Sequence, residues 1–201
     1  MMPKSKAGRS AEVERKTKET QISVSLNLDG DGNSNISTGV GFFDHMLDAL
    51  AKHAHFDLTV TCQGDLHIDA HHSVEDVGIA MGEALGLCLG DKAGLARFGH
   101  AYAPLDEALC RAVVDLSGRA WLEFGVTFST ERVGDMPCEL FEDFFWAFAD
   151  RGRFNLHLDV LRGRNSHHIA EAVFKSSARA LAMAVARDPR ASGIPSTKGS
   201  L

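Results

Sequence analysis

The feature that most constrains this chain is an internal duplication. The motif His-His-x-x-Glu occurs twice, at 71–75 and at 167–171. Each copy follows a segment of the form Phe-Asp/Asn-Leu, at 56–58 and 154–156, and no linker separates the two halves. Self-similarity of this kind indicates two copies of one structural unit. We therefore expect one compact body with two pseudo-symmetric halves.

Hydrophobic patterning gives each copy strands and two helices. Alternating segments predict strands at 21–28, 35–38, 56–61 and 66–69, and then at 108–116, 121–128 and 154–161. Helical spacing of apolar residues predicts helices at 43–50, 74–88, 141–148 and 169–186. The fold class is thus α+β, a duplicated βαβα-type repeat. The predicted organisation is a flexible N-terminus at 1–14, repeats at 15–92 and 93–187, and a C-terminal tail at 188–201.

Composition excludes several function classes. A formal net charge of -6 argues against a general nucleic-acid binder, which needs a basic face. No apolar run approaches the roughly 20 residues that cross a bilayer, and the basic N-terminus is not followed by the apolar stretch of a secretory signal. The four cysteines have no Cys-x-x-Cys spacing, which indicates buried thiols in a reducing compartment. We expect a cytoplasmic protein with no membrane partner.

The duplicated motif has the chemistry of a metal site. The chain has ten histidines, and most of them cluster near the two motifs. Residues four apart on a helix share a face, so His71 can bind with Glu75 and His167 with Glu171. The second histidine of each pair points about 100° away and cannot easily join the same ion. The simplest arrangement is two metal sites. Each combines a His/Glu pair from one copy with the second histidine of another motif, His72 or His168, which we call the odd histidine. Solvated or capping histidines are the alternative, and the matched duplication weighs against it.

Two further groups of side chains are candidates for the same site. His45 lies on the polar side of its predicted helix, and Asp143 holds the equivalent position in the second copy. This fixed place in the repeat favours a ligand over a surface histidine. The other group has the right types to hold a phosphate dianion by charge-assisted hydrogen bonds, although each member alone is typical of a solvated surface. Its members are Arg97, Arg119, Lys175, Lys198, His53 and Ser196.

Four segments together resemble imidazoleglycerol-phosphate dehydratase. They are GVGFFDHMLDALAKH at 39–53, DAHHSVED at 69–76, RGRNSHHIAEAVFK at 162–175 and PSTKG at 195–199. The resemblance runs from about Arg15 to the C-terminus. It implies helices packed between two mainly β-sheets, and a homo-oligomer of 24 subunits. It also implies two Mn²⁺ per subunit, held between subunits, with the substrate imidazole bound to metal.

The resemblance also implies a division of labour among residues. One metal site would use His45, His72, His167 and Glu171, and the other His71, Glu75, His168 and Asp143. Exchanging the two halves turns one set into the other, in agreement with the repeat. The family often has histidine where this chain has Asp143, which could bind directly, bind through water or leave a position open. Substrate contacts are implied for every metal ligand except Asp143. They are also implied for Glu19, His53, Arg97, Arg119, Lys175, Ser196, Thr197 and Lys198. Thr197 stands where serine is common.

The implied reaction removes water from D-erythro-imidazoleglycerol phosphate to give imidazole-acetol phosphate in histidine biosynthesis. The carbon proton that is lost has no adjacent carbonyl, so the imidazole ring must act as the electron sink, assisted by a metal ion. Glu19, Glu75 and Glu171 are the acid/base candidates, and their assignment to particular carbons stays open. Two other classes remain as alternatives. One is a non-catalytic metal-binding or storage assembly, and the other is a binuclear hydrolase that would cleave the phosphate ester.

Overall fold

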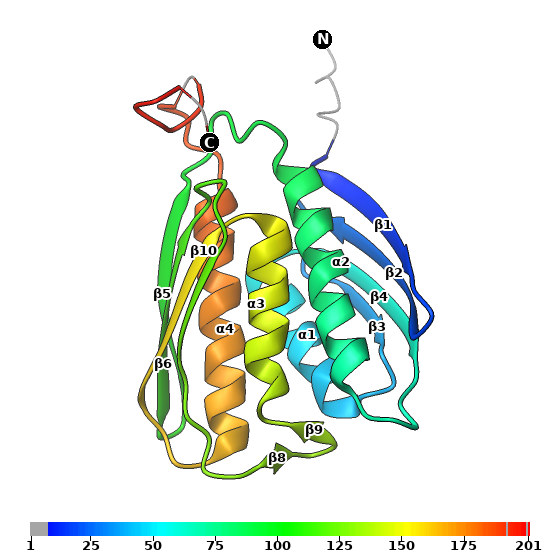
Figure 1. Cartoon of the computed structure of the whole chain (residues 1–201). Coiled ribbons are helices and arrows are strands. Elements are labelled where there is room, and N and C mark those ends of the chain that lie inside the picture. Colours follow the sequence, from blue (N-terminus) through cyan, green and yellow to red (C-terminus); the bar gives the residue numbers. More distant parts are fainter. Residues whose placement is uncertain (1–7, 192, 200) are drawn as a thin grey trace.

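Four helices lie between two four-stranded sheets in a computed structural model that describes residues 8–191, 193–199 and 201 (Figure 1). The first sheet has the order β1-β2-β4-β3, formed by β1 Ser10–Lys16, β2 Thr20–Asn27, β4 Asp57–Gly64 and β3 Ser34–Ser37. The second has the order β5-β6-β10-β7, formed by β5 Phe98–Leu105, β6 Ala108–Asp115, β10 Asn155–Arg162 and β7 Trp121–Gly125. The helices are α1 Gly41–Ala54, α2 His71–Leu89, α3 Leu140–Gly152 and α4 Ser166–Val185.

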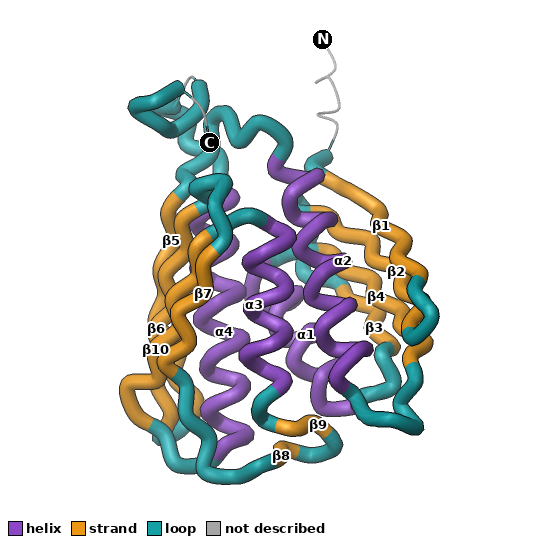
Figure 2. Tube along the Cα trace, in the orientation of Figure 1, coloured by secondary structure: helices purple, strands orange, loops and turns teal. Residues whose placement is uncertain are grey.

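The layers follow the duplication. In each sheet the first three strands are antiparallel, and the last strand pairs in parallel, β3 with β4 and β7 with β10. Helices α1 and α2 pack on the first sheet, α3 and α4 pack on the second, and the pairs meet as α1 with α4 and α2 with α3 (Figure 2). The predicted α+β duplication, with helices between two sheets, is confirmed. The second half adds a short hairpin, β8 Arg132–Val133 and β9 Met136–Pro137, that has no counterpart among the described residues of the first.

Four features of the secondary structure differ from the prediction. Strand β1 begins at Ser10, so the predicted flexible segment 1–14 is wrong for its second part, while residues 1–7 lie outside the described residues. This charged edge strand buries only Val13 and so gives a weak pattern. Strand β5 was not predicted because its buried face is made of small residues; a Cβ on Gly99 would lie 1.9 Å from the Ala180 carbonyl oxygen of α4.

The predicted strand at 66–69 is also wrong, because this segment is a turn. The backbone N–H of Ile68 donates to the Asp65 carbonyl (2.7 Å), which folds the chain back on itself. Leu66 and Ile68 imitate an alternating strand, but both are exposed. The strand predicted at 121–128 ends earlier, at Gly125, because it is a short edge strand beside β10.

The thiols behave as the composition predicts. Cys62, Cys88, Cys110 and Cys138 are all free and buried. Burial raises the pKa of Cys88 and of Cys110 to about 11, which keeps both as neutral thiols near pH 7. No described helix is both long enough and apolar enough to cross a membrane.

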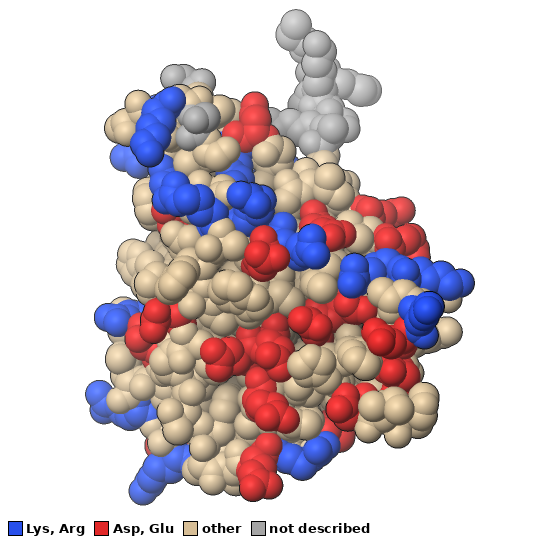
Figure 3. Space-filling view, viewed as in Figure 1, with Lys and Arg blue, Asp and Glu red and all other residues tan. Residues whose placement is uncertain are grey.

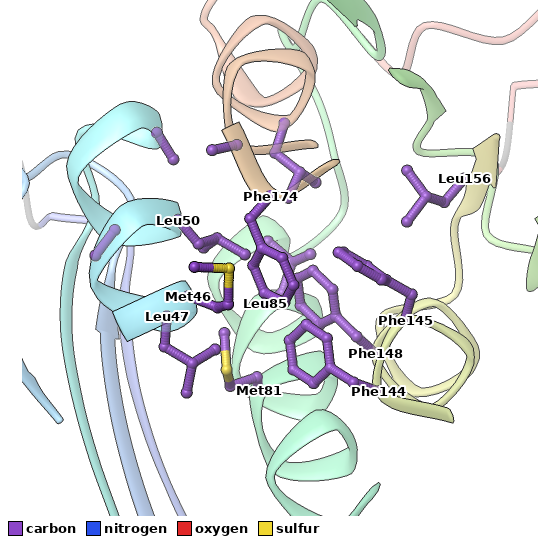
Figure 4. Close-up of a cluster of buried hydrophobic side chains, with 14 of the residues drawn as sticks. Met46, Leu47, Leu50, Met81, Leu85, Phe144, Phe145, Phe148, Leu156 and Phe174 are labelled. Carbon is purple, nitrogen blue, oxygen red and sulfur yellow. The ribbon is translucent and has the colours of Figure 1, made fainter. Parts of the chain in front are cut away.

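An aromatic cluster fills the space where the four helices meet (Figure 4). The ring of Phe174 on α4 lies 4.8 Å from that of Phe145 and 5.6 Å from that of Phe144, measured between centroids. Phe43 on α1 meets Phe144 edge-on at 5.2 Å. These rings are fully buried. They join both halves into one core, since they come from both repeats.

Helix α2 approaches α3 through a stripe of glycines. A Cβ on Gly78 would lie 2.8 Å from the Phe144 carbonyl oxygen, and one on Gly82 would lie 2.7 Å from the Phe148 carbonyl oxygen. Gly86, one turn further, has 3.8 Å to its nearest neighbour. The two helices therefore touch backbone to backbone at the first two positions only.

This spacing predicts opposite effects of the same substitution within one helix. Gly82→Ala should lower the free energy of unfolding by about 1–3 kcal/mol, because it forces α2 away from α3. Gly86→Ala should raise it by about 0.5–1 kcal/mol, because alanine favours the helix and finds room. Urea unfolding followed by circular dichroism, at one fixed protein concentration, measures both. Equal stability of the two variants would contradict the close helix contact.

Candidate active site

Two histidines and a glutamate converge where α1 meets α4. The Nε2 atoms of His45 and His167 lie 3.2 Å and 3.0 Å from the same oxygen, Oε1 of Glu171. One ligand atom from each side chain lies within 4.8 Å of the others. The histidine side chains are about half exposed, whereas that of Glu171 is only 13% exposed. The structure thus brings together three of the four ligands predicted for one site.

Local capping fixes this geometry. Asn165 caps α4 by accepting a hydrogen bond from the backbone N–H of His167 (2.9 Å), which places His167 in the first turn. The first two N–H groups of α1 donate to the Asp135 carboxylate in the turn between β8 and β9, at 2.6 Å and 2.9 Å. The ring of Phe42 then packs edge-on against His167 (5.1 Å) and His45 (6.2 Å). The two helix starts are therefore held side by side with their imidazoles facing.

Glu171 is anionic in this setting. Burial alone would raise its pKa, but the ion pair with Lys175 and the contacts with His45 and His167 outweigh burial and hold its pKa at about 2. Lys175 lies one turn along α4 and occupies the other carboxylate oxygen, Oε2. A group with such a low pKa is suited to bind a cation and poorly suited to donate a proton near pH 7.

A second, more open cluster repeats the first in the other half. His71 on α2 lies 3.5 Å from Oδ2 of Asp143 through Nδ1, and 3.9 Å from Oε2 of Glu75 through Nε2. Asp143 stands in the first turn of α3, where His45 stands in α1. The side chains of all three are roughly two-fifths exposed. The arrangement has the pseudo-symmetry that the duplicated motif predicts.

The odd histidine of each motif points elsewhere. The rings of His71 and His72 cross at 81° with centroids 6.0 Å apart, and those of His167 and His168 cross at 86° and 6.2 Å. Within the described part of the chain, the three-ligand group contains neither His72 nor His168. Each odd histidine instead places Nδ1 against a carboxylate. The first predicted metal site thus has three of its four ligands gathered in one chain, whereas in the second His71 lies near both Asp143 and Glu75 without the three forming such a group among the described residues.

Those carboxylates were not predicted as site residues. Asp65 contacts Nδ1 of His72 at 3.1 Å and Glu107 contacts Nδ1 of His168 at 2.7 Å, and these hydrogen bonds raise the pKa of both histidines. Glu107 in turn has its pKa lowered to about 2, chiefly by the bond with His168. No spacing signal identifies either residue, since they reach the motif from different loops. The cap at Asn165, by contrast, has a readable signature before an apolar helix.

A pocket lined by cations lies at the opposite end of α4. In Figure 3, Lys and Arg gather near the C-terminal tail, and Asp and Glu dominate the lower middle of the same face. The pocket has a volume of about 310 Å³ and is lined by Arg97, Ser117, Gly118, Arg119, Ser196, Thr197, Lys198 and Leu201. Arg97 is held by Asp115 (2.7 Å) and donates to the Pro195 carbonyl (2.7 Å), which ties the tail to the body. The guanidinium and ammonium groups suit a phosphate dianion.

The remaining predicted substrate residues are dispersed. Lys175 lies with Glu171, as described above. His53 lines a different cavity with His55, His100 and Arg179, and burial, followed by the charges of Lys175 and Arg179, lowers its pKa. Glu19 is exposed at the turn between β1 and β2. One chain therefore holds the predicted substrate contacts in several separate places.

Comparison with known proteins decides the family. The family model for imidazoleglycerol-phosphate dehydratase matches residues 38–181. A relative of that name from Methylobacillus flagellatus is 58% identical over 196 residues, covering 97% of this chain and 99% of the relative. One from Lacticaseibacillus casei is 57% identical over 191 residues, covering 95% and 98%.

The chain belongs to the imidazoleglycerol-phosphate dehydratase family.

Solved structures of imidazoleglycerol-phosphate dehydratases agree with this assignment. The Staphylococcus aureus enzyme aligns with a TM-score of 0.81 at 40% identity, covering 89% of this chain and 99% of that one. The Pyrococcus furiosus enzyme, solved in complex with (S)-C348, aligns with a TM-score of 0.82 at 35% identity, covering 94% and 100%. The chain is therefore a dehydratase, which is a hydro-lyase. A ferritin-like store would need a four-helix bundle, whereas the helices here lie between sheets.

Proposed function

We propose that this imidazoleglycerol-phosphate dehydratase removes water from D-erythro-imidazoleglycerol phosphate to give imidazole-acetol phosphate, in the cytoplasm and as a step of histidine biosynthesis. The observation that carries the proposal is the convergence of His45, His167 and Glu171 in a chain of this family. The cation-lined pocket at the tail supplies the phosphate end of the same site. The pseudo-symmetric cluster around His71 supplies a second metal position.

The donor set fits a first-row divalent metal, and we propose Mn²⁺, two per subunit. Adjacent ligands of an octahedral ion with bonds of about 2.1 Å lie about 3 Å apart. The two His–Glu171 separations, 3.2 Å and 3.0 Å, match that spacing. The proposed ligands are His45, His72, His167 and Glu171 for one ion, and His71, Glu75, His168 and Asp143 for the other. When bound, the metal acts as a Lewis acid that lowers the N–H pKa of the substrate imidazole.

The chain's own carboxylates divide the remaining work. Glu171 is anionic and ion-paired with Lys175, so it serves as a ligand. Glu19 is exposed and directly precedes Thr20, whose hydroxyl donates to Asp76, one turn beyond the proposed ligand His72 on α2. We therefore assign the proton exchange with the substrate to the carboxylate of Glu19. Arg97, Arg119, Ser196, Thr197 and Lys198 bind and orient the phosphate.

The separation of these groups supports a site shared between copies of the chain. The backbone N–H of Arg97 donates to the carbonyl of Ala184, thirteen residues beyond Glu171 on α4. At 1.5 Å per residue this is about 20 Å, far longer than a substrate made of one imidazole ring, three carbons and a phosphate. A second copy must therefore bring its phosphate pocket or its odd histidine to the cluster. We propose a homo-oligomer of 24 subunits with the metal ions at its contacts.

One incubation tests the reaction. The Mn²⁺-loaded protein is mixed with imidazoleglycerol phosphate, and the enolisable ketone product is followed by its absorbance in alkali while inorganic phosphate is assayed in parallel. Formation of the ketone with the phosphate ester intact supports the dehydratase. Release of inorganic phosphate supports a hydrolase instead. Metal binding with no turnover of any kind would leave a metal store.

The tail contact makes a prediction of its own. Lys198→Ala, or a chain that ends at Ala191, should raise the KM about 10- to 150-fold, which corresponds to the roughly 1.5–3 kcal/mol of one lost charge-assisted hydrogen bond. Metal content and particle mass should not change, since the clusters lie at the other end of α4. Arg190→Ala is the matched control, because that side chain is 88% exposed and pairs with Asp188. An unchanged KM in the truncated chain would leave Arg97 and Arg119 as the phosphate-binding residues.

A further inference from the structure

The two repeats place a glutamate at the same point of equivalent hairpins. Glu19 directly precedes β2 and Glu107 directly precedes β6. Each is the second residue of the two-residue tip that joins its antiparallel pair. His72 and His168 are likewise equivalent, since each is the second histidine of its motif. The duplication therefore pairs one hairpin glutamate with one odd histidine in each half.

In the second half the hairpin glutamate is fully engaged. Oε2 of Glu107 lies 2.7 Å from Nδ1 of His168, and Oε1 accepts the backbone N–H groups of Arg164 (3.0 Å) and Asn165 (2.8 Å). A carboxylate on Nδ1 fixes the orientation of a histidine and leaves its Nε2 for a metal. Glu107 is thus a positioning residue for His168.

In the first half a different residue does this work. Asp65 directly follows β4, and its two oxygens lie 3.2 Å and 3.1 Å from Nδ1 of His72. The equivalent position after β10 is Gly163. A Cβ there would lie 2.6 Å from Cγ1 of Ile169, so the second half has no room for a counterpart of Asp65. The orienting carboxylate therefore comes from the hairpin tip in the second repeat and from the end of a strand in the first.

Because Asp65 contacts His72 in the first half, the hairpin glutamate Glu19 is not bound to that histidine, although its hairpin tip stays near it. Among the described residues, no hydrogen bond or ion pair is formed by the Glu19 carboxylate. Its backbone is fixed, because the Glu19 N–H donates to Oγ1 of Thr17 (3.1 Å), and Oγ1 of Thr20 donates to the buried carboxylate of Asp76 on α2 (2.5 Å). Asp76 lies one turn beyond His72 on the same helix face. The hairpin tip is thus anchored beside His72.

We propose that Asp65 is a positioning residue that holds His72 in place of the hairpin glutamate and so frees Glu19 to act on the substrate. The proposal rests on the function proposed above. It deepens that function by explaining why two equivalent glutamates have different roles. It also predicts that removing Asp65 recruits Glu19 to His72, as Glu107 is recruited to His168.

A double-mutant cycle on Mn²⁺ affinity tests the exchange. The assembled protein is titrated with Mn²⁺ and free ion is read by electron paramagnetic resonance, in the wild type, Glu19→Gln, Asp65→Gly and the double variant. Glu19→Gln should leave the affinity unchanged in the wild-type background. In the Asp65→Gly background the same change should lower it about 10- to 100-fold, because His72 then has no orienting carboxylate. Glu12→Gln, an exposed change on β1, is the control in both backgrounds.

The outcomes separate cleanly. An equal loss of affinity in both backgrounds would mean that Glu19 already holds His72, and no effect in either would mean that it never does; each overturns the proposal. Turnover gives a second, independent readout. Asp65→Gly should lower kcat as strongly as Glu19→Gln, because Glu19 is then recruited to His72, while the variant keeps most of its Mn²⁺ affinity. If Asp65→Gly fails to assemble, Asp65→Ala repeats the cycle. Wild-type protein without dehydratase activity would refute the proposed function, whereas the affinity cycle would still report on the exchange.

Discussion

Glu171→Gln should lower kcat/KM by at least about 100-fold and reduce bound metal from two ions to one per chain. Loss of an outer partner of a metal ligand already costs 10- to 100-fold, and Glu171 is itself at the centre of the cluster. The amide keeps the shape but not the charge that the pKa of about 2 guarantees in the wild type. It also leaves Lys175 without its ion-pair partner. Metal analysis of the purified variant and initial rates with excess Mn²⁺ measure both effects.

Glu142→Gln provides the control for this prediction. Glu142 is an exposed glutamate in the first turn of α3, beside Asp143, and it is outside both clusters. The control should keep both ions and full activity. Two ions per chain in Glu171→Gln, together with normal turnover, would show that the cluster is not a metal site.

Removal of metal should take the proposed 24-subunit particle apart into small oligomers. The odd histidines are not among the ligands gathered around Glu171 in their own chain, so in the proposed assembly a second copy completes the ligand set and each ion ties subunits together. A chelator near pH 6 should therefore lower the mass measured by light scattering. Acid helps because a histidine must be neutral to bind metal. The raised pKa of His72 and of His168 means that protons compete from a higher pH than for an ordinary histidine.

Readdition of Mn²⁺ at neutral pH should restore the particle, and readdition of Mg²⁺ should do so poorly, because imidazole is a weak ligand for Mg²⁺. The same pH without chelator is the control for acid alone. A particle that keeps its full mass with no bound metal would show that protein contacts suffice and that the ions do not bridge subunits.

The duplication made most of the fold predictable. Repeated motifs located equivalent helices and strands, and the helix predicted at 74–88 lies within α2 and stops near Gly90, where the backbone takes a positive φ of 54°. The edge strands β1 and β5 were not predicted because their sequences lack alternating large apolar residues. In β5 the reason is physical: the backbone of α4 lies so close that only small side chains such as Gly99 fit. A pattern of large residues could not exist there.

The site was predictable to the extent that helical spacing governs it. His167 and Glu171 are four residues apart and do meet, and His45 joins them because its helix packs on α4. Asp65 and Glu107 were not predicted, since they approach equivalent histidines from non-equivalent loops. The distance between Arg97 and the cluster also has no trace in the sequence. Such relations depend on how helices and strands pack in three dimensions, and the local amino-acid sequence around each residue does not specify that packing.

The hairpin between β8 and β9 makes the first repeat dependent on the second. Its Asp135 closes the start of α1, where Val40 offers no side-chain cap, so a segment of the second repeat completes a helix of the first. Expressed alone, the first repeat would begin its His45 helix with bare N–H groups, at a cost of about 1 kcal/mol. Two copies of it could not repair this, because neither carries the hairpin. The first half therefore relies on the second for the cap of its His45 helix. The two halves are alike in fold but unequal in self-sufficiency.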